Sequence, residues 1–173
     1  MSYAEDRAWS DQFIPHIRAI VGPRLLVESP LEVDTKQAAD LIVLKARDMT
    51  VAARVRRAGY AERYPWDFTL RSRRDSGAKT EFRKIVEGWG DWLLYGHEGE
   101  KSRLARWLLI DLHELRAEMI YDAHRPSRRL PDPMKPIANG DGTHFIAYNV
   151  RRLPSRIVVA SSHPIPRPQS EAA

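Results

Sequence analysis

The sequence predicts a single α/β domain in which helices flank a mixed central sheet. The chain has 173 residues, which is the usual length of one domain. Its apolar fraction of 43% is enough for a packed core, and its charged fraction of 29% is close to that of ordinary folded domains. Segments with helical and with strand periodicity alternate along the chain. Three successive strand-like segments with short links predict an antiparallel three-strand meander within the sheet.

The N-terminal segment is predicted to be helical over residues 5–21. Phe13, Ile17 and Ile20 follow steps of three and four residues, which places them on one apolar stripe. Pro15 lacks the backbone N–H that a helix interior needs, so we expect the helix to kink or to split there.

The predicted meander consists of residues 40–45, 50–57 and 67–73. The first segment, DLIVLK, is apolar on both faces, which is typical of a central strand covered from both sides. The other two, TVAARVRR and DFTLRSR, alternate apolar with polar or basic residues, as half-buried strands do.

The second half of the chain continues the alternation of helices and strands. Residues 125–135 are rich in proline and arginine, and we expect them to be irregular. The proline-rich residues 163–173 predict a disordered tail after a domain of residues 1–162. The other predicted elements are helices over 79–87 and 113–122 and strands over 91–95, 105–112, 143–150 and 157–160.

Composition excludes several classes of protein and site. The sequence contains no cysteine, which removes disulfides, thiolate metal sites and cysteine nucleophiles, and which fits a reducing cytoplasm. No run of apolar residues approaches the length of a membrane span. The N-terminus lacks the pattern of a secretory signal, so a cytoplasmic protein is expected.

Positive charge is concentrated in two parts of the chain. The net charge is +5, yet residues 47–74 alone carry eight arginines against three acidic residues. Residues 125–173 carry eight basic residues against three acidic ones. A basic middle and tail on a slightly acidic remainder indicate a surface that faces a polyanion. The alternative is that these arginines are solvated or pair with acids elsewhere.

Two pairs of arginines are the candidate nucleic-acid-binding residues. Arg54 and Arg56 share one face of a predicted strand, and Arg71 and Arg73 share a face of the next. If these faces coincide, like charges crowd together and need an anion or carboxylates to neutralise them. Arginine suits phosphate because its fork can donate two parallel hydrogen bonds. The alternative is an internal ion-pair network with the acids Asp40, Asp67 and Glu81.

A cluster of aromatic residues follows the predicted helix over 79–87. Trp89, Trp92 and Tyr95 lie in the glycine-flanked stretch GWGDWLLYG. Aromatic rings beside a basic sheet can stack on nucleic-acid bases. A place in the buried core is the alternative, and the sequence leaves both interpretations open.

Several segments resemble known families. The strings ADLIVL, RVRR, DFTLR, KTEFRKIVEGWGDWLLYG and WLLIDLHELR, over roughly residues 35–120, look like a group of uncharacterised phage and prophage proteins. Their element order of helix, three strands, helix and strand resembles the PD-(D/E)XK, or restriction-endonuclease-like, superfamily. That resemblance implies a Mg²⁺ ion held by Asp40 and Glu81, with Lys84 as a third catalytic residue. The pattern departs from the family at Ala53-Arg54-Val55-Arg56, which stands where an acid-x-lysine motif is expected, so the resemblance is to a degenerate member.

These observations lead to one functional hypothesis and one alternative. The first is a nucleic-acid-binding protein, DNA being favoured over RNA, which needs Mg²⁺ only if it also cleaves. Whether it is an enzyme is left open by the sequence. The alternative is a non-enzymatic phage protein that binds a host defence or replication factor. The resemblance also implies a homodimer.

Overall fold

The computed structural model describes residues 3–28, 41–43, 49–124 and 137–166. Asp40 and the predicted tail from residue 167 onward therefore lie outside the described residues. The helices are α1 (Tyr3–Asp11), α2 (Ile14–Val21), α4 (Tyr60–Arg63), α5 (Glu81–Val86) and α6 (Leu112–His124). The strands are β1 (Leu26–Glu28), β2 (Leu41–Val43), β3 (Val51–Arg56), β4 (Asp67–Arg74), β5 (Trp92–Glu98), β6 (Leu104–Asp111), β7 (Ile137–Ala138), β8 (Thr143–Asn149) and β9 (Val158–Ser161).

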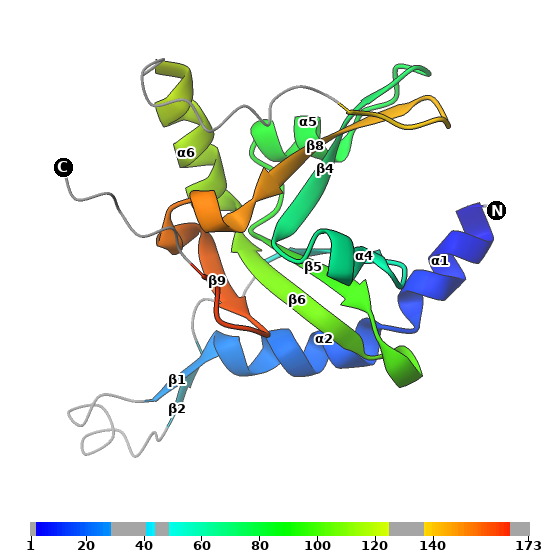
Figure 1. Ribbon diagram of the computed structural model, residues 1–173. Helices are drawn as coiled ribbons and strands as arrows, with labels where there is room; N and C mark the ends of the chain where they lie inside the picture. Colours follow the sequence, from blue (N-terminus) through cyan, green and yellow to red (C-terminus); the bar gives the residue numbers. More distant parts are fainter. Residues whose placement is uncertain (1–2, 29–40, 44–48, 125–136, 167–173) are drawn as a thin grey trace.

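A mixed four-stranded sheet forms the centre of the molecule (Figure 1). Its strand order is β3-β5-β6-β9, with β3 parallel to β5 and the other neighbours antiparallel. Arg54 of β3 lies opposite Tyr95 of β5, and Tyr95 lies opposite Leu108 of β6. Within this sheet β3 is an edge strand, so its outer side is open to other parts of the molecule or to a ligand.

Helices α1 and α2 cover one face of this sheet. Leu94 of β5 and Leu109 of β6 are fully buried against Phe13 and Ile17 of the helical segment. The expected break at Pro15 is confirmed, because α1 ends at Asp11 and α2 begins at Ile14. Pro15 occupies the first turn of α2, where the missing N–H costs no intrahelical hydrogen bond.

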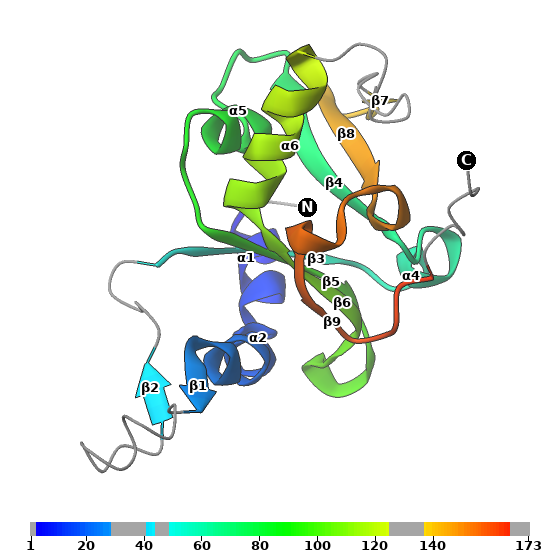
Figure 2. The ribbon, with the colours of Figure 1, turned by 90° about the vertical axis from the view of Figure 1, so that its left-hand side faces the viewer.

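The opposite face is covered by a second sheet together with α5 and α6 (Figure 2). The second sheet has the order β4-β8-β7 and is antiparallel throughout. Leu93 and Tyr95, which alternate with Leu94 along β5, pack there with Phe68 of β4 and Tyr148 of β8. Alternation along the central strands thus supplies apolar residues to both layers.

The predicted meander of residues 40–45, 50–57 and 67–73 is wrong, although each segment contains a strand. The three strands belong to three different sheets: β2 pairs with β1, β3 with β5, and β4 with β8. Helix α4 and the link around it carry the chain out of the central sheet between β3 and β4. The periodicity of a strand shows which residues share a face, but it does not identify the partner strand.

Two further details differ from the sequence-based expectations. Strand β5 continues through Gly96 to Glu98, beyond the predicted end of 91–95. Ile165, in the first part of the predicted tail, packs against the core. Over the residues that the structure describes, none of the helices combines the length and apolar character of a membrane span.

Candidate functional site

A groove of about 780 Å³ opens beside the free edge of β3, between α1, β4 and α5. Two carboxylates, Asp6 and Glu81, line it. Against them stand eight basic side chains. Arg7 and Lys79 pair with Asp11 and Glu87, which do not line the groove, so four positive charges remain in excess of the carboxylates. The basic residues are Arg7, Arg54, Arg56, Arg57, Arg71, Arg74, Lys79 and Lys84.

Glu81 joins three elements at the floor of the groove. Its Oε2 accepts a hydrogen bond of 2.7 Å from Nη1 of Arg54 on β3. The same oxygen accepts a longer bond of 3.3 Å from the backbone N–H of Arg71 on β4. Arg54 is therefore held by a carboxylate, as the ion-pair alternative expected, and Glu81 fixes the spacing of β3, β4 and α5.

A β-bulge at Ser72 separates Arg71 from Arg73. The register of β4 against β8 shifts between these two arginines, so they occupy successive positions of the ladder and point to opposite faces. Arg71 and Arg74 line the groove. Arg73 instead lies 3.4 Å from a carboxylate oxygen of Asp75 and 2.8 Å from Nε2 of His144. The expected shared face of Arg71 and Arg73 is wrong, and Arg74 takes the place predicted for Arg73.

Arg71 lies in a strongly positive environment. Burial lowers its pKa from the ordinary value, and the neighbouring Arg74 and Arg54 lower it further. Glu81 and Asp141 act in the opposite sense. The guanidinium stays charged at neutral pH because its pKa starts so high. Within the described part of the chain, neither Arg71 nor Arg74 forms a side-chain ion pair, so an incoming anion would relieve their repulsion.

Helix α5 presents Lys84 to the same space. Thr80 caps the helix by accepting a hydrogen bond from the N–H of Arg83, and its hydroxyl donates to the carbonyl of Ser72 at the bulge. Glu81 lies on the same side of the helix as the buried Ile85, four residues later, and Lys84 is adjacent to Ile85; all three residues line the groove. Lys84 has no ion-pair partner among the described residues.

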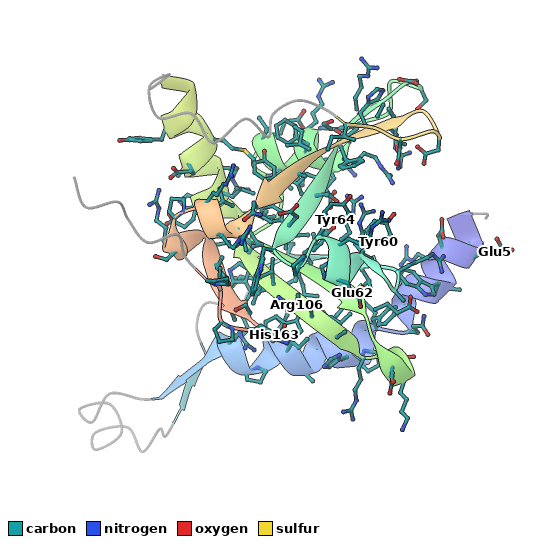
Figure 3. The ribbon with its side chains drawn as sticks, in the orientation of Figure 1. Glu5, Tyr60, Glu62, Tyr64, Arg106 and His163 are labelled. Atoms are coloured by element: carbon teal, nitrogen blue, oxygen red, sulfur yellow. The ribbon has the colours of Figure 1, made fainter. Side chains whose placement is uncertain are left out.

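Aromatic rings support the basic side chains at the far end of β3. The guanidinium of Arg56 lies 4.9 Å from the ring centre of Tyr60, and that of Arg57 lies 4.3 Å from the ring of Trp9. Figure 3 shows Tyr60 and Tyr64 together at α4, with Glu5 set apart on α1. These contacts hold two cations near the groove; Arg57 is also paired with Asp6 over 3.2 Å.

The described residues do not supply the ligand set of a divalent metal ion. Among them, no three His, Asp or Glu side chains lie close enough together to hold an ion. Glu81 is occupied by Arg54, a cation in the position where Mg²⁺ would compete. Asp40, the other predicted metal ligand, lies outside the described residues.

Four of the basic groove residues were not among the predicted site residues: Arg7, Arg57, Arg74 and Lys79. Arg74 was missed because the regular alternation of a strand does not predict a bulge, and the bulge changes which residues share a face. Arg7 comes from the N-terminal helix, far from the basic segment in sequence. Lys79, which pairs with Glu87, lies in the link before α5. The sequence did contain a signal for Lys79. It is the first residue of the helix predicted over 79–87, about one and a half turns before Lys84.

Comparison of the chain with models of protein families, with curated proteins and with solved structures finds no match.

Proposed function

We propose that the groove beside β3 binds nucleic acid through its phosphates. One observation carries the proposal: eight basic side chains converge on one groove that holds two carboxylates. A surplus of this size attracts a polyanion, and guanidinium and ammonium groups are the usual partners of phosphate oxygens.

Arg71, Arg74 and Lys84 are the central phosphate ligands of this proposal. They line the groove from β4 and α5, and none of them forms an ion pair with a described carboxylate. Arg54 has a different role, because its bond to Glu81 orders the groove floor. Arg56 adds charge at the end of β3, where Tyr60 supports it. Arg73 is no longer a candidate ligand.

The bulge provides a matched pair of variants for the test. Arg71→Ala and Arg73→Ala remove the same side chain from the same strand, one from each face. Binding of a labelled oligonucleotide is measured by fluorescence anisotropy over a series of salt concentrations. We expect Arg71→Ala to weaken binding and to reduce the slope of log K against log salt by about one, the loss of one phosphate contact. Arg73→Ala leaves that slope unchanged. Equal effects of the two variants, or binding that does not respond to salt, would overturn the proposal.

The salt series and a cleavage assay test the two other hypotheses. A host-protein partner with an apolar interface centre responds less to salt than a polyanion does, and it predicts no affinity for the oligonucleotide. The cleavage hypothesis, like the restriction-endonuclease-like resemblance, needs Asp40, and it needs Glu81 to exchange Arg54 for Mg²⁺. Incubation of the oligonucleotide with Mg²⁺, followed by analysis of fragment length, tests it directly.

A further inference from the structure

Trp89 is an exposed aromatic residue on the groove. Its relative exposure is 68%, the largest among the exposed large apolar residues of the described chain. It also lines the groove. Tyr95, the last aromatic of the same sequence stretch, is buried in the core, and Trp92 packs against the helical layer. The interpretation as buried core therefore applies to Tyr95 and Trp92. It does not apply to Trp89, because core packing does not explain the position of its exposed ring.

The backbone of Trp89 is firmly held although its ring is exposed. Helix α5 ends in a Schellman motif, with Gly88 at a φ of 97°. The N–H of Gly88 donates to the carbonyl of Ile85, and the N–H of Trp89 donates to the carbonyl of Lys84, both over 3.0 Å. Arg116 of α6 donates to the carbonyl of Gly90 over 3.0 Å. Such bonds fix the backbone from which the ring projects, which reduces the entropy lost when a ligand stacks on the ring.

Tyr60 places a second exposed ring on the same groove. Its relative exposure is 43%, and Arg56 lies over the ring. Trp89 belongs to the loop in which Asp91 binds the backbone N–H of Thr50, just before β3, whereas Tyr60 follows the end of β3. The two rings therefore flank a strand of six residues, roughly 20 Å long at about 3.3 Å per residue.

The geometry points to a single-stranded nucleic acid as the occupant of the groove. Bases stack on Trp89 and Tyr60, and the phosphates between them contact Arg71 and Lys84. The N–H of Trp89 donates to the carbonyl of Lys84 and both residues line the groove, so a cation for a phosphate and a ring for a base come from neighbouring backbone positions. In a duplex the bases already stack on one another and their faces are unavailable, whereas a single strand offers them to aromatic side chains. This inference rests on the proposed phosphate-binding function and specifies its substrate class.

The test compares single-stranded and duplex oligonucleotides of about a dozen nucleotides, a length within the range that single-strand binders cover. Anisotropy titrations use wild type, Trp89→Ala, Trp89→Phe and Val86→Ala. Val86 is the matched control because it is an exposed apolar residue of the same helix end, with 55% exposure, and it does not line the groove. Thermal unfolding of each variant confirms that it folds. Oligodeoxythymidine and oligouridine serve as DNA and RNA arms.

We expect the single strand to bind more tightly than the duplex. Trp89→Ala should weaken single-strand binding by about tenfold, the contribution of one stacked base, with no change in the salt slope. Trp89→Phe should keep most of the affinity, and Val86→Ala should keep all of it. Equal affinity for duplex and single strand, or an unaffected Trp89→Ala, would overturn this inference while leaving phosphate binding intact. Absence of binding to either nucleic acid would remove the proposed function as well.

Discussion

Arg54 and Glu81 form the ion pair on which the groove is built. Nη1 of Arg54 lies 2.7 Å from Oε2 of Glu81, and their side chains are 18% and 27% exposed. The pair joins the edge of the central sheet to α5, and Glu81 also accepts the backbone N–H of Arg71 from the second sheet. Glu81 is thus both a structural link and one of the two negative charges in a basic groove.

Replacing Glu81 with glutamine separates these two roles. The amide oxygen of Glu81→Gln can still accept hydrogen bonds, but the negative charge is lost. We expect the free energy of unfolding to fall by about 1 kcal/mol, since a charge-assisted hydrogen bond becomes a neutral one. Affinity for an oligonucleotide should rise at low salt, because the groove becomes more positive. Chemical denaturation and anisotropy titration measure the two effects. Weaker binding by Glu81→Gln would show instead that the carboxylate itself takes part in ligand binding.

Thr80 connects the start of α5 to the bulge that orients Arg71 and Arg74. Its buried hydroxyl donates to the carbonyl of Ser72 over 3.1 Å and accepts the N–H of Arg83. We expect Thr80→Val, which keeps the shape but removes the hydroxyl, to lower the free energy of unfolding by about 1–2 kcal/mol. Thr80→Ser retains the cap and should lose less. In urea denaturation, a loss for Thr80→Ser as large as that for Thr80→Val would contradict this expectation, because the methyl group that serine lacks would then contribute as much as the hydroxyl that valine lacks.

The location of the groove could be predicted in part from the sequence. The arginine-rich segment of residues 47–74 does supply much of its lining, including Arg54 and Arg71. The alternation of apolar and basic residues correctly placed Arg54 and Arg56 on one side of a strand. Which side chains share a face of a strand is a local property, and the alternation of residue types along the sequence is enough to predict it.

The partners of the strands could not be predicted in the same way. β3 pairs in parallel with β5, and this pairing requires the chain to pass through β4 and α5 before it returns. β4 meets its partner β8 about 80 residues later in the sequence, as the pairing of Asp67 with Asn149 shows. Contacts of such separation depend on the packing of whole layers. The bulge at Ser72 is a further local irregularity that periodicity does not reveal.

Arg156 provides a test of whether groove charge, rather than overall charge, governs binding. It pairs with Glu114 over 2.8 Å and with the buried Glu118, both on α6. It does not line the groove. We expect Arg156→Ala to lower the free energy of unfolding by about 1–2 kcal/mol, because Glu118 is left without this partner; the half-exposed position of Arg156 keeps the loss moderate.

Oligonucleotide affinity of Arg156→Ala should stay close to that of wild type. A second change, Glu118→Gln in the Arg156→Ala background, should restore part of the stability, since the two residues interact directly. A fall in affinity equal to that of Arg71→Ala would mean that net charge, and not the groove, determines binding.

His97 makes stability depend on pH near neutrality. It is 3% exposed, and its Nδ1 has no hydrogen-bond partner among the described residues. Burial lowers the pKa of His97 below the ordinary 6.5, and Arg106 and Arg56 lower it further, while Glu62 opposes them. A base with a lower pKa in the folded state binds fewer protons when folded than when unfolded. The free energy of unfolding therefore falls as the pH drops through about 6.5, and it levels off below the folded-state pKa.

Urea denaturation from about pH 7.5 to about pH 5.5 measures this effect. We expect the midpoint of wild type to decrease over this window and that of His97→Gln to change less, because glutamine does not titrate. Asp67, whose pKa burial raises above 3.8, contributes in the opposite sense at more acidic pH and is common to both proteins. The difference between the two curves thus isolates His97. Parallel curves would show that the imidazole is protonated equally in the folded and unfolded states, so that burial at the end of β5 does not exclude its charge.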